Sequence, residues 1–252
     1  MSPITIVYSR PLYTHFLFFP KKEIKAEPAQ LEGVVRQDVQ IPVAGGGTVH
    51  GWFFKHESSP YVVLVNHGNA CNISSLDWIA RNVLSSGCSV LLYDYRGYGL
   101  SSKGKLSAES ICADGDAAYT YLTGTQGYDP DNVILYGQSL GCAVACHISS
   151  VHQVRALILQ SGFSSLRNVA YQRFPLLRHV PSRLVPDVLD NRAILSQSKL
   201  PLLLIHGDCD RVVPFENAQM LFEASGGEKK LVVCHNAGHR IFPQSDDIHR
   251  QA

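Results

Sequence analysis

The sequence predicts an α/β fold with a mostly parallel sheet, because strand-like and helix-like segments alternate along most of its length. The strand-like segments are short and almost wholly apolar, which is typical of strands covered by helices on both faces. They are Tyr61–Val65, Cys88–Tyr93, Val133–Tyr136, Ala156–Leu159, Leu202–Ile205 and Leu231–Val233. Apolar residues at helical spacing mark the stretches Ser74–Leu84, Ala108–Leu122, Leu140–Ser150 and Phe215–Ala224.

The sheet is predicted to begin with an antiparallel pair. The strand-like segments Val39–Val43 and Val49–Phe54 flank the sequence AGGGT, a glycine-rich turn that indicates a hairpin. Neither an internal repeat nor a low-complexity linker divides the 252 residues, of which 45% are hydrophobic. We therefore expect one domain, residues 1–252, with enough apolar residues to bury a substantial core.

One interval, residues 163–199, interrupts the alternation of strands and helices. It contains Pro175, Pro181 and Pro186 between short apolar pieces. A connection of this length inside a compact domain often forms a lid or a binding insertion. We therefore predict a small cap insertion over residues 163–199.

The charge balance and the cysteines exclude some functions. The chain has 22 Lys and Arg against 21 Asp and Glu, a net charge of +1, so no overall positive field favours nucleic acid. Its seven cysteines form no CxxC pair and have no zinc-like spacing. We read Cys142 and Cys146, one helical turn apart, as packing residues. Free thiols predict a reducing, cytoplasmic compartment, and we expect no metal and no organic cofactor.

The N-terminal region lacks the pattern of a signal peptide. Its apolar stretch Pro11–Pro20 is too short to span a bilayer, and Lys21, Lys22 and Lys25 follow it. This stretch could contact a membrane surface, which would make the protein peripheral, or it could pack along the edge of the sheet. We favour packing, because one short aromatic run is common in protein cores.

The strongest motif surrounds Ser139. The sequence VILYGQSLG places a GxSxG pattern between a buried strand and a helix. A nucleophilic serine needs this tight strand-to-helix turn, which lifts its hydroxyl above the sheet. Side chains at the positions of Gly137 and Gly141 would collide with neighbouring backbone. Ser139 is therefore our candidate nucleophile.

A serine nucleophile needs a base to accept its proton and a carboxylate to orient that base. Two aspartates follow the strand-like segment Leu202–Ile205, and we choose Asp210 because Asp208 lies closer to the strand end and suits a turn. Two histidines follow the last strand-like segment. We choose His239, since the preceding glycine lets its loop fold back over the serine, whereas His235 belongs to the strand end.

Ester cleavage also needs donors for the oxyanion that forms when the carbonyl is attacked. The first predicted donor is the backbone N–H of Leu140, directly after the nucleophile. The second is the N–H of Asn69, in the HGNA loop after the first apolar strand, where Gly68 permits close approach.

The motifs HGNA, YDYRGYGLS, YGQSLG, HGDCDRVVP and NAGH together resemble the α/β-hydrolase superfamily. More narrowly, they resemble the α/β-hydrolase-domain-containing serine hydrolases that include protein depalmitoylases. The resemblance implies the α/β-hydrolase fold, with a mostly parallel eight-stranded-type sheet and helices on both faces. It also implies a structural turn over Asp94–Gly99, in which we expect Asp94 to pair with Arg96.

We therefore predict a serine hydrolase that cleaves carboxylic ester or thioester bonds, including those of long acyl chains, through an acyl-enzyme. The expected substrate is a small-molecule or lipid acyl ester, with an acylated protein as a further candidate. A peptidase or acyltransferase could use the same residues, and a catalytically silent binding protein could keep the fold without activity.

The insertion is expected to contact the substrate through Phe163, Phe174 and Leu177. Its charges are mostly basic, with Arg167, Arg173, Arg178, Arg183, Arg192 and Lys199 against Asp187 and Asp190. An apolar, basic cap would suit an acyl chain beside an anionic headgroup or membrane surface. A solvated basic face over a packed helix would explain the same residues.

Overall fold

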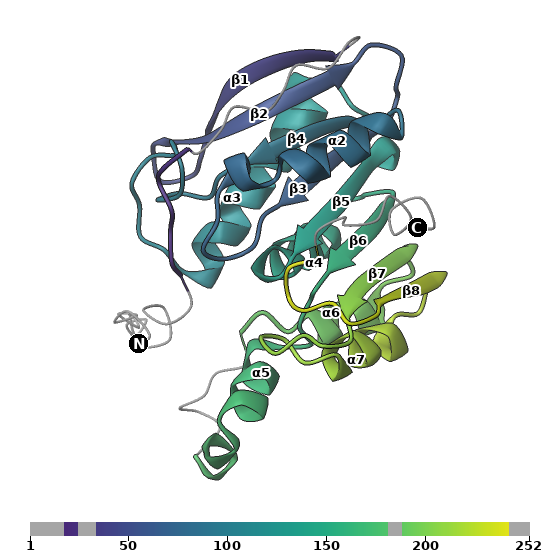
Figure 1. Cartoon of the computed structure of the whole chain (residues 1–252). Helices are drawn as coiled ribbons and strands as arrows, with labels where there is room; N and C mark the ends of the chain where they lie inside the picture. Colours follow the sequence, from purple (N-terminus) through teal and green to yellow (C-terminus); the bar gives the residue numbers. More distant parts are fainter. Residues whose placement is uncertain (1–17, 25–33, 181–187, 242–252) are drawn as a thin grey trace, which may run out of the picture.

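The structure, a computed structural model, describes residues 18–24, 34–180 and 188–241 (Figure 1). Its centre is an eight-stranded sheet with the strand order β1-β2-β4-β3-β5-β6-β7-β8. The strands are β1 Val34–Pro42, β2 Thr48–His56, β3 Val62–Asn66, β4 Ser89–Tyr93, β5 Val133–Gln138, β6 Ala156–Gln160, β7 Leu202–Gly207 and β8 Lys229–Cys234. Every predicted strand is present, and the predicted mostly parallel sheet is confirmed.

The direction of the strands determines where the functional loops lie. β2 is antiparallel to both β1 and β4, whereas the six strands β3 to β8 run parallel to one another. Parallel strands end at the same edge of a sheet, so the loops that follow β3, β5, β7 and β8 are brought together. These loops carry the residues predicted to act in catalysis.

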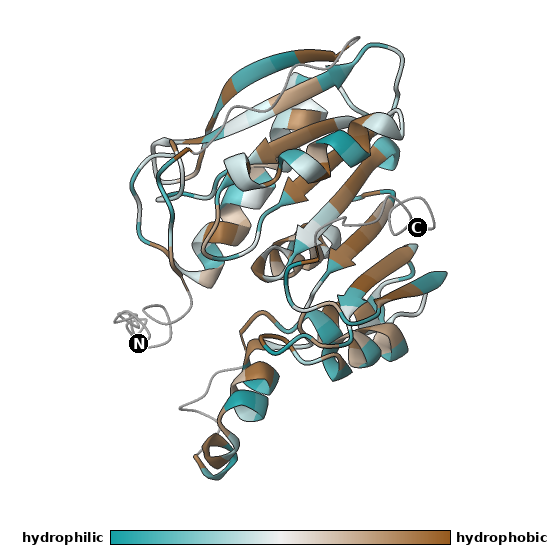
Figure 2. Cartoon of the chain, in the orientation of Figure 1, coloured by the Kyte–Doolittle hydropathy of each residue, from teal (hydrophilic) through white to brown (hydrophobic). Residues whose placement is uncertain are grey.

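Helices lie on both faces of the sheet, as expected. α3 (Ala108–Thr120), α4 (Leu140–Val151), α6 (Asn191–Gln197) and α7 (Glu216–Ala224) contribute to the larger hydrophobic cluster. α2 (Asp77–Ser85) packs on the opposite face. In Figure 2 the central parallel strands are predominantly hydrophobic, whereas β1 at the sheet edge alternates between hydrophobic and hydrophilic residues.

The strand β3 explains why these segments are apolar without interruption. Val62 and Leu64 face the larger cluster, and Val63 and Val65 face the cluster around α2. All four side chains are buried, because helices cover both faces. A continuous apolar run is the pattern that such a strand requires.

The predicted insertion, residues 163–199, divides into two parts with different surroundings. Its first part holds α5 (Leu166–Arg173) and the 3₁₀ helix η4 (Pro175–His179), which extend away from the sheet in Figure 1. Its last part, α6, returns to the core through the buried Leu195. Arg183 lies in residues 181–187, outside the described residues.

The segment before β1 partly matches the expectation of packing along the sheet. Residues 11–17 lie outside the described residues. Phe18 is buried in the larger cluster, whereas Phe19 is 53% exposed. Within the described part of the chain, no helix has the length and apolar character needed to cross a membrane.

Candidate active site

Ser139 occupies a strained turn between β5 and α4. Its backbone angles are φ 52° and ψ −112°, in a region that residues other than glycine rarely adopt. A Cβ atom at Gly137 would lie 2.6 Å from the Cα of Cys142, and one at Gly141 would lie 1.9 Å from the carbonyl oxygen of Asn66. Both contacts are impossible, so the turn requires glycine at these two positions.

The three residues predicted to act together form a continuous chain of hydrogen bonds. The Nε2 atom of His239 lies 2.9 Å from the Oγ atom of Ser139. Its Nδ1 atom lies 2.7 Å from the Oδ2 atom of Asp210. The carboxylate accepts a hydrogen bond from the N–H group at Nδ1, which leaves Nε2 as the acceptor for the serine hydroxyl. This arrangement can remove the serine proton during nucleophilic attack.

Asp210 is held by its own backbone and by a second histidine. Its Oδ1 atom accepts from the N–H groups of Val212 and Val213, at 2.8 and 2.9 Å. His206 Nε2 lies 3.3 Å from its Oδ2 atom. Burial alone would raise the pKa of Asp210, but hydrogen bonds from His206 and His239 hold that pKa well below its usual range. Asp210 is therefore a carboxylate at neutral pH.

Asp208 and His235, the residues not chosen as the carboxylate and the base, pair with each other and not with Ser139. Asp208 Oδ2 lies 2.9 Å from Nδ1 of the exposed His235, and Asp208 Oδ1 accepts from the N–H of Asn236 at 2.7 Å. Asp208 therefore stabilises the turn that follows β8.

The loop after β3 lies directly beside Ser139, as the predicted oxyanion site requires. A Cβ atom at Gly68 would come within 3.4 Å of the Ser139 Cβ. The side-chain oxygen of Asn69 accepts from the N–H of Phe19 and from the Tyr98 hydroxyl, both at 2.9 Å. These bonds fix the loop. Leu140 is the first residue of α4, where the N–H groups have no acceptor within the helix.

The expected ion pair between Asp94 and Arg96 does not form, and that prediction is wrong. Arg96 instead binds Asp114 of α3, with 2.6 Å between Nη2 and Oδ1. Asp94 is fully buried, and its Oδ1 atom accepts from the N–H of Ile73 at 2.9 Å. The turn still has a structural role, because Asp94 and Arg96 attach it to two different helical segments.

His67, a fully buried residue of the loop after β3, is neutral. Its Nδ1 atom lies 2.7 Å from the carbonyl oxygen of Gly68, and the N–H of Tyr95 donates to its Nε2 atom at 3.4 Å. Nδ1 therefore carries the proton and Nε2 accepts. Burial lowers the pKa of His67 to about 4 and raises the pKa of Asp94 to about 8. Their side chains, 3.6 Å apart, are consequently uncharged at neutral pH.

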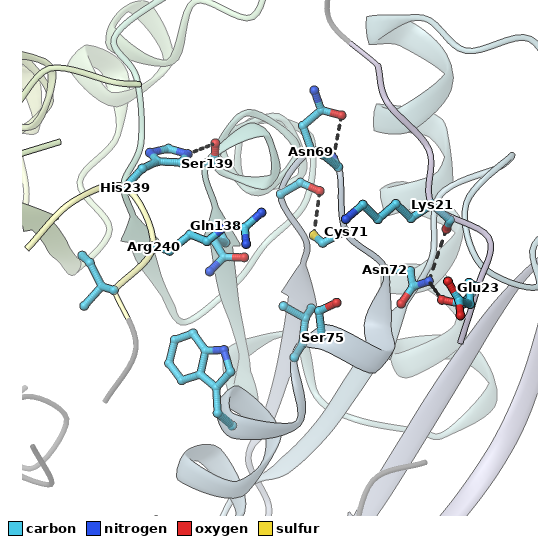
Figure 3. Close-up of a pocket in the computed structure, with 15 residues that line it drawn as sticks. Lys21, Glu23, Asn69, Cys71, Asn72, Ser75, Gln138, Ser139, His239 and Arg240 are labelled. Atoms are coloured by element: carbon cyan, nitrogen blue, oxygen red, sulfur yellow. Dashed lines mark hydrogen bonds between the residues drawn. The ribbon is translucent and has the colours of Figure 1, made fainter. Parts of the chain in front are cut away.

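A cavity of about 170 Å³ opens beside Ser139 (Figure 3). It is lined mainly by the segment before β1, the loop after β3, the start of α2 and the residues after His239. These lining residues are Lys21, Glu23, Gly68, Asn69, Ala70, Cys71, Asn72, Ser75, Leu76, Trp78, Gln138, Ser139, His239, Arg240 and Ile241. Sequence reasoning missed Lys21, Trp78 and Arg240 as site residues, because no motif marks them.

The three residues predicted to contact substrate do not line this cavity. Phe163 is buried against Ala143 and Val213. Phe174 is 62% exposed on the segment that extends from the sheet, and Leu177 is half-buried there. The prediction relied on apolar composition within the insertion, which does not distinguish a core side chain from one that faces the site.

The cysteines of the described chain form no disulfides. Cys142 and Cys146 are fully buried in the larger cluster, where they pack as expected. Cys71 lies in the cavity beside Ser139, and its thiol donates to the carbonyl oxygen of Gly68 at 3.1 Å. No group of three or more His, Cys, Asp or Glu within the described residues could hold a metal ion.

The fold and the arrangement around Ser139 are those of an α/β-hydrolase, and the chain belongs to this family. The family model described as the alpha/beta hydrolase fold matches residues 61–200. Among individual proteins, the uncharacterized protein Rv2307c of Mycobacterium tuberculosis is 35% identical over 81% of this chain and 72% of its own length.

Two further proteins extend the comparison. The alpha/beta hydrolase domain-containing protein 17C of Homo sapiens is 34% identical over 72% of this chain and 54% of its own length. The solved structure of the esterase Pf2001 of Pyrococcus furiosus superposes with a TM-score of 0.75. The superposition includes 90% of this chain and 91% of the esterase chain. The sequence identity is 19%, so this likeness concerns the fold alone. The chain thus has an esterase-like α/β-hydrolase fold.

Proposed function

We propose that the protein is a serine hydrolase that cleaves carboxylic ester or thioester bonds through an acyl-enzyme. The observation that carries the proposal is the hydrogen-bonded chain from Ser139 through His239 to Asp210. The esterase-like fold and the position of the loop after β3 beside the serine support it.

In the first half-reaction, the Oγ atom of Ser139 attacks the substrate carbonyl while its proton moves to Nε2 of His239. The Asp210 carboxylate stabilises the resulting imidazolium. The N–H groups of Leu140 and Asn69 donate to the oxyanion. The bond to the leaving oxygen or sulfur then breaks, and His239 gives its proton to the leaving group.

In the second half-reaction, water attacks the acyl group on Ser139, and His239 accepts a proton from this water. The ester bond to Oγ then breaks, and the proton returns to Oγ. Apart from the substrate and this water, both half-reactions use only groups of the chain. A long acyl chain would exceed the cavity of about 170 Å³ and would have to extend along the protein surface.

The proposal is tested by labelling with a fluorophosphonate probe and by turnover of p-nitrophenyl esters from C2 to C16. We expect the wild type to be labelled and Ser139→Ala to lose both labelling and turnover. Ser150→Ala is the matched control, because Ser150 is an exposed serine of the same helix α4. The chain-length profile will separate a short-ester enzyme from a long-acyl one.

A folded wild-type protein that is neither labelled nor active would contradict the proposal. That outcome would favour a catalytically silent binding protein on the same fold. If the probe labels Ser139 but esters are not hydrolysed, assays with peptide bonds and with acyl acceptors would separate a peptidase from an acyltransferase.

A further inference from the structure

Two positive side chains enter the cavity beside Ser139 from opposite sides. Lys21 belongs to the segment before β1, and Arg240 directly follows His239. Figure 3 shows both side chains extending toward the space around Cys71. They therefore come from distant parts of the sequence to the same cavity.

The fold fixes the backbone at both positions. The carbonyl oxygen of Lys21 accepts from the N–H of Gly99 at 2.9 Å and from the Asn72 side chain at 3.2 Å. Arg240 lies between two anchored carbonyl groups: Ser161 Oγ donates to the carbonyl oxygen of His239, and Gln160 Nε2 donates to that of Ile241. The backbone from which each side chain extends is therefore held by the same loops that build the site.

Neither cation is neutralised by another described residue. Lys21 and Arg240 form no ion pair with any side chain in the described part of the chain. Glu23 is the cavity's one carboxylate among those residues, and it lies beyond Asn72 from Ser139 in Figure 3. The described lining of the cavity between Glu23 and Ser139 therefore carries two cations and no carboxylate.

Cys71, between the two cations, does not supply a compensating negative charge. Burial and the nearby Asp94 raise the pKa of Cys71 to about 12, although Lys21 and Arg240 act in the opposite direction. The thiol is therefore neutral at physiological pH. Among the described residues, neither Cys71 nor an ion pair compensates the two cations, and this is the electrostatic situation of a binding site for a negatively charged group.

We propose that this cavity binds an anionic group of the substrate, a carboxylate or a phosphate, between Lys21 and Arg240. The inference rests on the proposed ester-cleaving function and narrows its substrate class to esters that carry a negative charge near the scissile bond. The cavity of about 170 Å³ is close to the ~150 Å³ that admits benzene, so the group that carries the charge is small. Arginine suits either anion, because its guanidinium donates two parallel hydrogen bonds.

The kinetic test compares anionic esters with neutral esters of matched shape. On the alcohol side, 4-acetoxybenzoate and 4-acetoxyphenyl phosphate are compared with 4-methylphenyl acetate. On the acyl side, mono-4-nitrophenyl adipate is compared with 4-nitrophenyl hexanoate. We expect the wild type to prefer the anionic ester of at least one set in kcat/KM. Lys21→Gln and Arg240→Gln should each reduce that preference about tenfold, mainly through KM, as expected for one charge-assisted hydrogen bond.

Lys22→Gln is the matched control, because Lys22 is the exposed neighbour of Lys21 and does not line the cavity. We expect this variant to keep the wild-type preference. A wild type that prefers no anionic ester by more than twofold would overturn the inference. An equal loss in the Lys22 and Lys21 variants would also overturn it, since a general surface charge would then explain the effect.

A binding measurement separates this inference from the proposed function. Ser139→Ala is titrated with benzoate and with phenyl phosphate, and the fluorescence of Trp78 in the cavity wall is followed. We expect saturable binding that weakens about tenfold when Lys21→Gln or Arg240→Gln is added. The tighter probe identifies the preferred anion.

Failure of the proposed hydrolase function and failure of the anion site would give different results. Probe binding that depends on Lys21 and Arg240, in a protein whose wild type hydrolyses no ester, would uphold the anion site and refute the hydrolase. Turnover of neutral esters with no probe binding and no anionic preference would uphold the hydrolase and refute the anion site.

Discussion

Asp210 determines which nitrogen of His239 carries a proton. In Asp210→Asn, the side-chain amide could donate to Nδ1, which would move the imidazole proton to Nε2 and remove the acceptor for the serine hydroxyl. We expect kcat to fall about 10⁴-fold, as estimated for the same change of the orienting carboxylate in this type of site. Ester turnover and circular dichroism are the measurements.

The fold should survive this change, because an asparagine oxygen can still accept from the N–H groups of Val212 and Val213. A variant that retains more than a tenth of wild-type kcat would contradict the role given to Asp210. A variant that loses its secondary structure would require Asp210→Glu, which keeps the negative charge, as a second test.

Asp94 couples stability to pH. Its pKa is raised to about 8 in the folded protein by burial, whereas an unfolded aspartate titrates near 3.8. Between these values the unfolded chain has released the proton that the folded chain keeps, so stability falls as pH rises from about 4 to about 8. Asp94→Asn cannot titrate and still accepts from the N–H of Ile73.

We therefore expect the free energy of unfolding to fall less between pH 5 and pH 8 in Asp94→Asn than in the wild type. The difference cannot exceed about 1.4 kcal/mol per pH unit for one proton. Urea denaturation at both pH values measures it. Identical pH dependence in the two proteins would show that Asp94 is ionised in the fold.

The strand-to-helix turn between β5 and α4 is the element most sensitive to added volume. In Gly141→Ala, the new methyl group would meet the carbonyl oxygen of Asn66 on β3. We expect a loss of about 3 kcal/mol or more in unfolding free energy, because backbone on both sides prevents relaxation. Thermal denaturation measures the stability, and fluorophosphonate labelling measures the reactivity of Ser139.

Gly124→Ala is the control for this change, because a Cβ at Gly124 meets nothing within 4 Å and its backbone needs no left-handed conformation. It should alter stability by less than about 0.5 kcal/mol. Similar losses in the two variants would mean that the turn is not the reason for glycine at position 141.

The segment of α5 and η4 carries exposed basic and apolar side chains together. Arg173 and Arg178 are exposed, and Leu176 is 81% exposed. If this surface contacts anionic lipid, Arg173→Glu with Arg178→Glu should reduce turnover of esters in anionic vesicles at least tenfold more than turnover of a soluble short ester. Hydrolysis in vesicles and in solution measures this ratio.

Lys103→Glu with Lys105→Glu reverses two exposed charges outside the insertion and is the matched control. Because Arg173 Nη1 donates to the carbonyl oxygen of Arg211 at 3.0 Å, the melting temperature of both double variants is compared as well. Equal losses on vesicles and in solution would favour the solvated basic face instead.

At the level of elements, the sequence predicted the strands and turns that have a local residue pattern. It did not predict features that depend on contacts between distant segments. The strand β3 was predictable, because burial on both faces leaves a continuous apolar run. α5 and α6 were not, since both helices are short and the three prolines between them interrupt the apolar pattern. Ser139 was predictable from the glycines that its turn requires, whereas Lys21 and Arg240 meet only through tertiary folding, without any local pattern.

At the scale of the whole molecule, the site is assembled from residues far apart in the sequence. Ser139 and His239 are 100 residues apart, and the strands that position them belong to one sheet. If residues 1–252 unfold as a single domain, fluorophosphonate labelling and far-ultraviolet circular dichroism should be lost at the same urea concentration. Loss of labelling well before loss of secondary structure would contradict this expectation.

The strand order also has a consequence for synthesis on the ribosome. β3 pairs with β4 on one side and with β5 on the other, and β5 is made about 45 residues after β4. At ribosomal rates this interval lasts several seconds. During that time β3, whose first four residues are apolar, has one unpaired edge, which is a template for association with other nascent chains. This edge therefore stays open to such association until β5 has been made.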